Sequence, residues 1–357
     1  MDIFEAMRSR GHEQISFFYD KATGLRLIVA VHDTSLGPAA GGCRVWHYDS
    51  ESEAVLDALR LSEGMTLKNA VAGLNFGGSK CVVYGDPEIT PDLLRAIGRF
   101  VDTLGGRVLT GEDVGLTPED VEIMAEETPS IVGRASKSGE PSKPAAYGTY
   151  MAIRAVLKRL FGEPSPGGRR IVIQGAGNVG TELSRLLHEG GAEIVISDIR
   201  PERARRVAEL YGAKMVDPDV VMDEEGDVLS PCALGLSLTV DAARNLKVRG
   251  VAGSANNQLA DRSVPAILKE RGILYAPDFV VNGGGIINIS DEFGPGGYDA
   301  RRAREAVEKI YDRLLEIFEE ADRRGLTTDE AAEGIARARI SMEGKRGPYV
   351  PRWTGRS

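Results

Sequence analysis

The sequence has few of the residues that mark several large classes of protein. Its 357 residues include three cysteines, four histidines and two tryptophans. Cys43, Cys81 and Cys232 are odd in number, far apart and set among apolar residues, so they fit neither a disulfide framework nor a zinc site. The histidines show no metal-ligand spacing. We therefore expect buried thiols and no metal.

Long apolar runs are also missing. No stretch approaches the length of a membrane span, and the first residues, MDIFEAMRSRGHEQ, lack a signal-peptide core. The formal net charge is -9 and no basic stripe stands out, which argues against a nucleic-acid surface. The composition, 42% hydrophobic and 27% charged, is that of an ordinary globular protein, and 357 residues suit two domains. We expect a cytoplasmic protein with no membrane partner.

Residues 64–80, GMTLKNAVAGLNFGGSK, place Lys68 and Lys80 among apolar residues on either side of a glycine-rich turn. An ammonium in a partly apolar wall loses hydration, which lowers its pKa, so one lysine could serve as a general base. The other could hold a substrate carboxylate. The same pattern fits two lysines whose stems cover apolar surface at a strand edge. Both interpretations stay open at this point.

The segments around these lysines predict an α/β unit. Residues 14–19 and 24–31 predict a β-hairpin, and the glycines at Gly41 and Gly42 predict either a bulge or a ligand-facing turn. The expected helices and strand are a helix at 52–62 with Ser52 as its N-cap, a strand at 81–86, and a helix at 91–104 behind Thr90.

Two acidic residues, Glu112 and Asp113, follow a short apolar run. They are either carboxylates at the rim of a site or the N-terminal charge of a helix that begins at Thr117 and Pro118. Residues 133–144 then have the composition of a linker, so we place a domain boundary there.

From residue 145 onward, strands and helices alternate as in a doubly wound parallel sheet. The expected elements are a helix at 145–162, a strand at 169–174, a helix at 181–191, strands at 193–198, 228–234, 248–255, 273–277 and 279–282, one long helix at 300–323, a last helix at 329–340 and a basic tail at 345–353.

A G-x-G-x-x-G fingerprint lies between the first of these strands and its helix. It comprises Gly175, Gly177, Asn178, Val179 and Gly180, and Asp198 ends the next strand at the expected distance. The glycines would make a tight turn, admit a pyrophosphate and pack the helix closely.

Asp198 would bind the adenosine ribose and repel a 2′-phosphate, which favours NAD over NADP, and Arg200 tempers this preference. Ligands of such sheets lie beyond the carboxyl ends of the strands. Further cofactor contacts are therefore expected at the strand ends that carry Cys232, Ala233, Asn256 and Asn282.

Seven segments, taken together, resemble a known family. They are GPAAGGCRVW, GMTLKNAVAGLNFGGSK, TGEDVG, QGAGNVG, SPCALG, AGSANNQL and YAPDFVVNGGGIIN. In this order they resemble the amino-acid dehydrogenases of the leucine, valine and phenylalanine type, relatives of glutamate dehydrogenase, from about residue 10 to 340. The resemblance implies reversible NAD-dependent oxidative deamination of an L-amino acid to its 2-oxo acid and ammonia. It also implies a homo-oligomer, which is often an octamer in the leucine enzymes.

The resemblance further implies two domains with the active site in the cleft between them. Residues 1–140, completed by a C-terminal helix at 327–357, would form an α/β substrate-binding and oligomerisation domain, and residues 145–326 a Rossmann-type NAD-binding domain. Within the matching motifs, Lys68 corresponds to the lysine that binds the substrate carboxylate, Lys80 to the catalytic lysine, and Asp113 to the carboxylate that moves protons.

Other matches concern the rest of the site. Asn256 corresponds to a residue near the nicotinamide, and Gly41 and Gly42 to glycines that line the substrate backbone. Three positions depart from the family pattern: Ser79 stands for a glycine and could touch the base, Ala145 for a threonine near the nicotinamide, and Gly283 for an alanine.

The positions that resemble the side-chain pocket are all apolar: Ala40, Met65, Ile286 and Ile289. No lysine or arginine is there to meet the γ-carboxylate of glutamate, so glutamate should be rejected. A branched-chain substrate, such as leucine, valine or isoleucine, is expected. Leucine enzymes usually have leucine where Ala40 stands, which keeps a phenylalanine or other aromatic dehydrogenase as an alternative. A catalytically silent NAD-binding protein is a further alternative.

Overall fold

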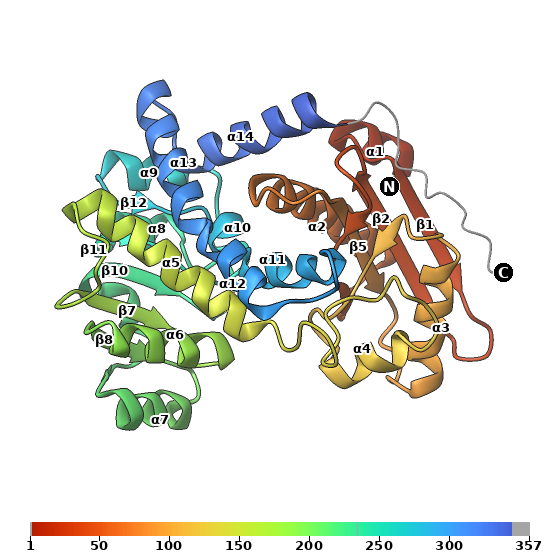
Figure 1. Cartoon of the computed structure of the whole chain (residues 1–357), viewed down its shortest axis with the longest axis horizontal. Coiled ribbons are helices and arrows are strands. Elements are labelled where there is room, and N and C mark those ends of the chain that lie inside the picture. Colours follow the sequence, from red (N-terminus) through yellow and green to blue (C-terminus); the bar gives the residue numbers. More distant parts are fainter. Residues whose placement is uncertain (1, 234, 345–357) are drawn as a thin grey trace. The chain divides into compact units, whose positions relative to one another are not determined.

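The computed structural model describes residues 2–233 and 235–344, which fall into two compact units (Figure 1). Within that range, unit 1 contains residues 2–140, 289–298 and 336–344, and unit 2 contains residues 141–288 and 299–335. The assignment of domains to 1–140 and 145–326 stays a prediction. The basic tail expected at 345–353 lies outside the described residues.

Unit 1 is built on a six-stranded mixed sheet in the order β1-β2-β5-β3-β6, and β4 also pairs with β5. Its strands are β1 (Gln14–Tyr19), β2 (Arg26–Asp33), β3 (Ala39–Ala40), β4 (Cys43–Val45), β5 (Gly77–Val83) and β6 (Val108–Leu109). Strands β1 and β2 are antiparallel, which confirms the predicted hairpin. The helices of this unit are α1 (Ile3–Arg10), α2 (Glu51–Val71), α3 (Pro91–Asp102) and α4 (Pro118–Met124).

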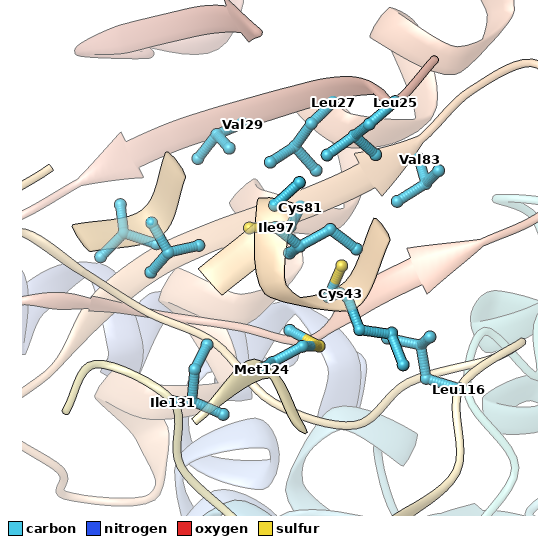
Figure 2. Close-up of a cluster of buried hydrophobic side chains, with 14 of the residues drawn as sticks. Leu25, Leu27, Val29, Cys43, Cys81, Val83, Ile97, Leu116, Met124 and Ile131 are labelled. Atoms are coloured by element: carbon cyan, nitrogen blue, oxygen red, sulfur yellow. The ribbon is translucent and has the colours of Figure 1, made fainter. Parts of the chain in front are cut away.

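Helices cover both faces of this sheet. On β2, Leu27 and Val29 point into a core shared with α3 and α4 (Figure 2). Ile28 belongs to a second core, which β2 shares with α2. Successive side chains of a strand alternate between faces. On β5, Cys81 therefore joins the α3 and α4 core (Figure 2), and Lys80 lies on the face that α2 covers.

The central helix of unit 1 differs from its prediction at both ends. Helix α2 begins behind Ser50, whose hydroxyl accepts the N–H of Glu53, so Ser52 is not the N-cap. The helix also continues beyond residue 62 to Val71. Its later turns bury the polar residues Ser62, Thr66 and Asn69, so apolar periodicity could not reveal them. Lys68 therefore lies on a helix.

Among the other predicted boundaries of unit 1, the starts of two helices agree with the structure and the start of one strand does not. Thr90 caps α3, and a capping box at Thr117 starts α4, both as predicted. Strand β5 begins at Gly77 rather than at residue 81, and all of its residues are buried. The cysteines are free thiols; Cys43 and Cys81 are buried as expected, whereas Cys232 is half-buried.

Unit 2 contains a parallel sheet in the order β12-β11-β10-β7-β8-β9, which confirms the doubly wound Rossmann-type prediction. Its strands are β7 (Arg170–Gln174), β8 (Glu193–Ser197), β9 (Lys214–Met215), β10 (Glu225–Pro231), β11 (Lys247–Val251) and β12 (Leu274–Tyr275). The helices that accompany it are α5 (Ser142–Phe161), α6 (Asn178–Glu189), α7 (Pro201–Tyr211), α8 (Val240–Asn245) and α9 (Val264–Glu270). Residues of α8 and α9 close the core on one face of this sheet.

The C-terminal part of unit 2 corrects two predictions. Residues 279–282 are not a strand: they lie in or directly after helix α10 (Asp278–Val281), which α11 (Gly284–Ser290) follows. A short apolar run cannot distinguish a strand from a buried helix. The expected single helix at 300–323 is interrupted at Lys309, between α12 (Ala300–Glu308) and α13 (Ile310–Arg324). The last helix is α14 (Thr328–Glu343).

None of the helices within residues 2–233 and 235–344 combines the length and the apolar composition needed to cross a membrane.

Asp329, in the first turn of α14, yields a prediction about stability. Burial, followed by the negative charges of Asp278, Glu333 and Glu330, raises the pKa of Asp329 to about 7. The unfolded chain gives up this proton near pH 4, so the folded state loses stability as the pH rises from about 4 through 7. We expect Asp329→Asn to match the wild type near pH 4 and to be more stable by about 4 kcal/mol at pH 9.

Thermal unfolding at fixed protein concentration between pH 4 and pH 9 measures this difference. The same substitution at the exposed Asp312 of α13 serves as the control, with a difference from the wild type that does not grow with pH. A pH-independent difference for Asp329→Asn would contradict the prediction.

Candidate active site

Lys80 and Asp113 form a buried ion pair in unit 1. The Nζ atom of Lys80 lies 2.5 Å from Oδ2 of Asp113, and Lys80 is only 5% exposed. Strand β5, which carries Lys80, pairs with β2, β3 and β4, so it is not an edge strand. Lys80 therefore does not extend along a strand edge to reach solvent, and that interpretation was wrong for this residue.

Asp113 has a second cationic partner that sequence reasoning missed. Arg44 Nε lies 3.0 Å from the same Oδ2 atom, and Arg44 Nη1 lies 3.2 Å from Oδ2 of Asp57. Burial raises the pKa of Asp113, but the charges of Lys80 and Arg44 outweigh it, so the pKa lies below its usual value. The available signal was a charged residue, Arg44, two positions after the Gly41 and Gly42 pair.

Glu112 behaves in the opposite way to its neighbour. Its Oε2 atom is buried and has no hydrogen-bond partner among the residues described. Burial, then the charges of Glu140 and Asp113, raises the pKa of Glu112. Neither residue of the acidic pair belongs to α4, which begins at Pro118. Two adjacent carboxyl groups thus have pKa values shifted apart, a pattern often found where proton transfer occurs.

Gly41 and Gly42 allow the backbone to pass very close to the ion pair. A Cβ atom at Gly41 would lie 1.8 Å from the Ser79 carbonyl oxygen, and one at Gly42 would lie 2.7 Å from Asp113 Cβ. Close packing explains why both positions are glycine. The Ser79 hydroxyl donates to the Ala39 carbonyl at 3.0 Å, so it is held by the backbone.

The remaining expected substrate residues of unit 1 come from three elements. Met65 and Lys68 lie on α2, Ala40 lies on β3, and Ile289 lies near the end of α11. Sequence reasoning also missed Asn69, which is fully buried and donates to the Gly77 carbonyl at 2.6 Å. This bond joins the last turn of α2 to the start of β5. Ile289 packs within 3.1 Å of a Cβ built at Gly133.

In unit 2 the three fingerprint glycines serve three different purposes. Gly175 has φ +107°, which favours glycine, and no described atom lies within 4 Å of a Cβ built at Gly177. A Cβ at Gly180 would meet the Gly175 carbonyl oxygen at 1.9 Å. Asn178 and Val179 open helix α6, so its first N–H groups face the space that Gly177 leaves. This arrangement can hold a pyrophosphate.

Asp198 lies directly after β8 and fixes the fingerprint loop. Its Oδ2 accepts the N–H of Ala176 at 2.7 Å, and its Oδ1 accepts the N–H of Arg200 at 2.8 Å. It borders a cavity of about 230 Å³ with Gly175 and Ala233. Sequence reasoning missed the cavity's apolar lining residues: Ile199, Pro218 and Val221. Such a lining suits the flat face of an adenine base.

Asn256 and Asn282 meet in unit 2. The amide Nδ2 of Asn282 donates to Oδ1 of Asn256 at 2.9 Å. Oδ1 of Asn282 is buried and has no partner within the described chain. The Cys232 N–H donates to the Gln174 carbonyl at 2.7 Å. Ile286, an expected substrate contact, lies on α11.

Within residues 2–233 and 235–344, no three His, Cys, Asp or Glu side chains converge on a point that could hold a metal ion.

The close approach at Gly42 yields a testable consequence. We expect Gly42→Ala to lower the melting temperature and to cost about 1 to 3 kcal/mol, because the new methyl group must displace Asp113. The matched control is Gly64→Ala in the middle of α2. There, no described atom outside the helix's own backbone lies within 4 Å of the added Cβ, so the change should stabilise the protein by about 0.5 to 1 kcal/mol. Thermal unfolding of both variants checks this. Equal melting temperatures would contradict the packing argument.

Comparisons with known proteins extend these observations over the whole chain. Residues 12–130 match the family model of the Glu/Leu/Phe/Val dehydrogenase dimerisation domain, and residues 196–338 match that of the glutamate/leucine/phenylalanine/valine dehydrogenases. Leucine dehydrogenase of Thermoactinomyces intermedius is 46% identical over 347 residues, which is 96% of this chain and 94% of the relative.

A second relative is known from both sequence and structure. L-tryptophan dehydrogenase of Nostoc punctiforme is 43% identical over 96% of this chain and 97% of its own length. Its crystal structure superposes with a TM-score of 0.84 at 41% identity, covering 95% of this chain and 99% of that one. With two family models and relatives of this similarity along nearly its full length, the chain belongs to the Glu/Leu/Phe/Val dehydrogenase family and is an amino-acid dehydrogenase that uses a nicotinamide cofactor.

Proposed function

We propose that this protein catalyses the reversible, NAD-dependent oxidative deamination of a branched-chain L-amino acid to its 2-oxo acid and ammonia. The observation that carries the proposal is the buried contact between Lys80 and Asp113, at 2.5 Å, in a chain that is 46% identical to a leucine dehydrogenase. Ala40, Met65, Ile286 and Ile289, all apolar, are the proposed contacts of the substrate side chain. No basic residue among them could pair with a second substrate carboxylate.

In this proposal Lys68 binds the substrate carboxylate, and Gly41 and Gly42 line the substrate backbone. When bound, the nicotinamide would supply the acceptor for the hydride that leaves the substrate Cα. Neutral Lys80 then removes a proton from water as the water adds to the iminium carbon. Asp113 moves protons to and from the departing amine. The 2.5 Å contact between Lys80 and Asp113 gives the proton a direct route between the two groups.

The fingerprint residues of unit 2 would hold the cofactor. Gly175, Gly177, Asn178, Val179 and Gly180 supply the pyrophosphate site, and the cavity beside Asp198 and Ala233 takes the adenosine. Cys232, Asn256 and Asn282 would lie toward the nicotinamide. The buried Oδ1 of Asn282, which has no hydrogen-bond partner among residues 2–233 and 235–344, could accept a hydrogen bond from the carboxamide.

We further infer that residues 1–140, with 327–357, bind substrate and oligomerise, and that residues 145–326 bind NAD. The family model that matches residues 12–130 is that of a dimerisation domain, which supports self-association through this part of the chain. A homo-oligomer as large as an octamer is the proposal, with a cytoplasmic location.

The catalytic assignment is tested with Lys80→Ala. We expect kcat for L-leucine or L-valine to fall by about 100- to 10,000-fold because the general base is lost, while NADH binding, followed by fluorescence, persists. Lys21→Ala, at an exposed site in the turn of the hairpin, should leave kcat unchanged. Near-normal turnover by Lys80→Ala would remove this residue from the role of base.

The wild-type protein is assayed in parallel with a panel of L-amino acids. A kcat/KM for L-phenylalanine above that for L-leucine would replace the branched-chain proposal by an aromatic one, which the small side chain at Ala40 would then explain. Failure to oxidise any member of the panel would favour a silent NAD-binding protein.

Asp198 is the basis of the proposed preference for NAD. We expect Asp198→Asn to lower the ratio of kcat/KM for NAD to that for NADP at least about tenfold, because a charge that repels the 2′-phosphate is removed. Activity with NAD should also decline somewhat, since Asp198 holds the Ala176 N–H. The exposed Asp241→Asn is the control. An unchanged ratio would mean that Asp198 does not discriminate between the cofactors.

A further inference from the structure

Arg44 connects the ion pair to a second acidic side chain. It lies on β4, in register with Val82 of β5. Its Nε atom is 3.0 Å from Oδ2 of Asp113, and its Nη1 atom is 3.2 Å from Oδ2 of Asp57. Its side chain is 18% exposed. One planar guanidinium therefore bridges two carboxylates.

The far end of this bridge is itself fixed. Asp57 accepts the Tyr48 hydroxyl at 2.8 Å and Nη2 of Arg60 at 2.7 Å. It lies on α2, the helix that also carries Lys68. With Asp57 anchored by two other groups, Arg44 cannot turn away from Asp113 without breaking its own second contact. A guanidinium held at both ends loses little further freedom when it orients a carboxylate.

Lys80 and Arg44 contact the same oxygen, Oδ2 of Asp113. The proposed reaction requires Lys80 to become neutral, and Asp113 then loses the charge of that partner. Arg44 stays charged, because a guanidinium does not give up its proton in proteins. A buried carboxylate without any counter-charge is strongly disfavoured, so the second cation decides whether Asp113 can remain an anion at that moment.

We propose that Arg44 is a positioning residue for catalysis: anchored by Asp57, it holds the Asp113 carboxylate against Lys80 and remains its charge partner while Lys80 is neutral. This inference rests on the roles proposed for Lys80 and Asp113. It also explains why a charged residue occupies β4 between Cys43 and Val45, which belong to or pack against an apolar core.

The test is steady-state kinetics of the full-length protein across pH with Arg44→Gln, Arg44→Lys and Arg44→Ala. For Arg44→Gln we expect kcat to fall on the order of 100-fold, the loss typical of a misplaced catalytic group, with KM nearly unchanged. The acidic limb of the kcat profile should move to higher pH, since one of the cations that lower the pKa of Asp113 is gone. Arg44→Lys should recover part of kcat, because an ammonium restores the charge but cannot bridge both carboxylates.

Chemical rescue separates charge from packing. Low concentrations of guanidinium should raise kcat of Arg44→Ala, whereas urea, of similar size but uncharged, should not. Arg99→Gln is the matched control: this arginine of α3 pairs with Glu127 at 3.2 Å and is half-exposed. Its kcat and pH profile should equal those of the wild type.

Asp57→Asn tests the anchor without touching Arg44. We expect a smaller loss of kcat than in Arg44→Gln, because Arg44 keeps its charge but loses its second contact. A kcat equal to that of the wild type would contradict the role of the anchor. This variant also keeps the inference testable if the Arg44 variants do not fold.

The outcomes distinguish this inference from the proposed function. If the wild type oxidises no amino acid, or Lys80→Ala retains its turnover, the proposed function fails. If both of those tests succeed but Arg44→Gln behaves like Arg99→Gln, the role of Arg44 is overturned. If the Arg44 variants lose stability and kcat, but the pH profile does not move and guanidinium does not restore kcat, Arg44 only supports the fold. That result would also overturn the inference.

Discussion

The buried contact between Lys80 and Asp113 is the constraint on which the rest of unit 1 depends. Removing two charges from water costs several kcal/mol for each ion, and only close geometry with additional polar contacts offsets that cost. The sheet supplies the geometry by placing Lys80 on an interior strand. Arg44 supplies the additional contact, and Asp57 in turn holds Arg44. A series of four charged side chains therefore extends from the pair Lys80 and Asp113 through Arg44 to Asp57 on helix α2.

Small residues make this arrangement possible. A Cβ at Gly78 would meet the Thr66 backbone nitrogen at 2.3 Å, so α2 packs directly on β5 at this point. Gly41 and Gly42 let the neighbouring segment approach Ser79 and Asp113 just as closely. None of the three glycines, Gly41, Gly42 and Gly78, has a positive φ, so their backbone conformation does not require glycine. Their value is the short distance they permit between a helix, a strand and a loop that each carry charged residues.

Sequence patterns revealed what depends on local chain geometry. The hairpin, the Thr90 cap and the presence of a doubly wound parallel sheet follow from turns, caps and alternation within a few residues. The later turns of α2 were missed because they bury Thr66 and Asn69 instead of apolar residues. Residues 279–282 were assigned to a strand because four apolar or small residues carry no period. The role of Arg44 was missed because its partner Asp113 lies 69 positions away.

The two candidate sites are built differently, which explains why the sequence predicted the contacts of the unit 2 site in more detail than those of the unit 1 site. In unit 2 the Asp198 carboxylate accepts the N–H of Ala176, 22 positions away and across one helix. The shape of the loop and the proposed preference for NAD therefore depend on the same residue. The fingerprint is thus a short sequence pattern in which each glycine meets one separate steric requirement. In unit 1 the side chains that satisfy one another come from β4, α2, β5 and the segment after β6. No local pattern encodes such a network. Its residue types can be recognised in the sequence, but the partner of each charge is decided by the tertiary packing of glycines against helix and strand.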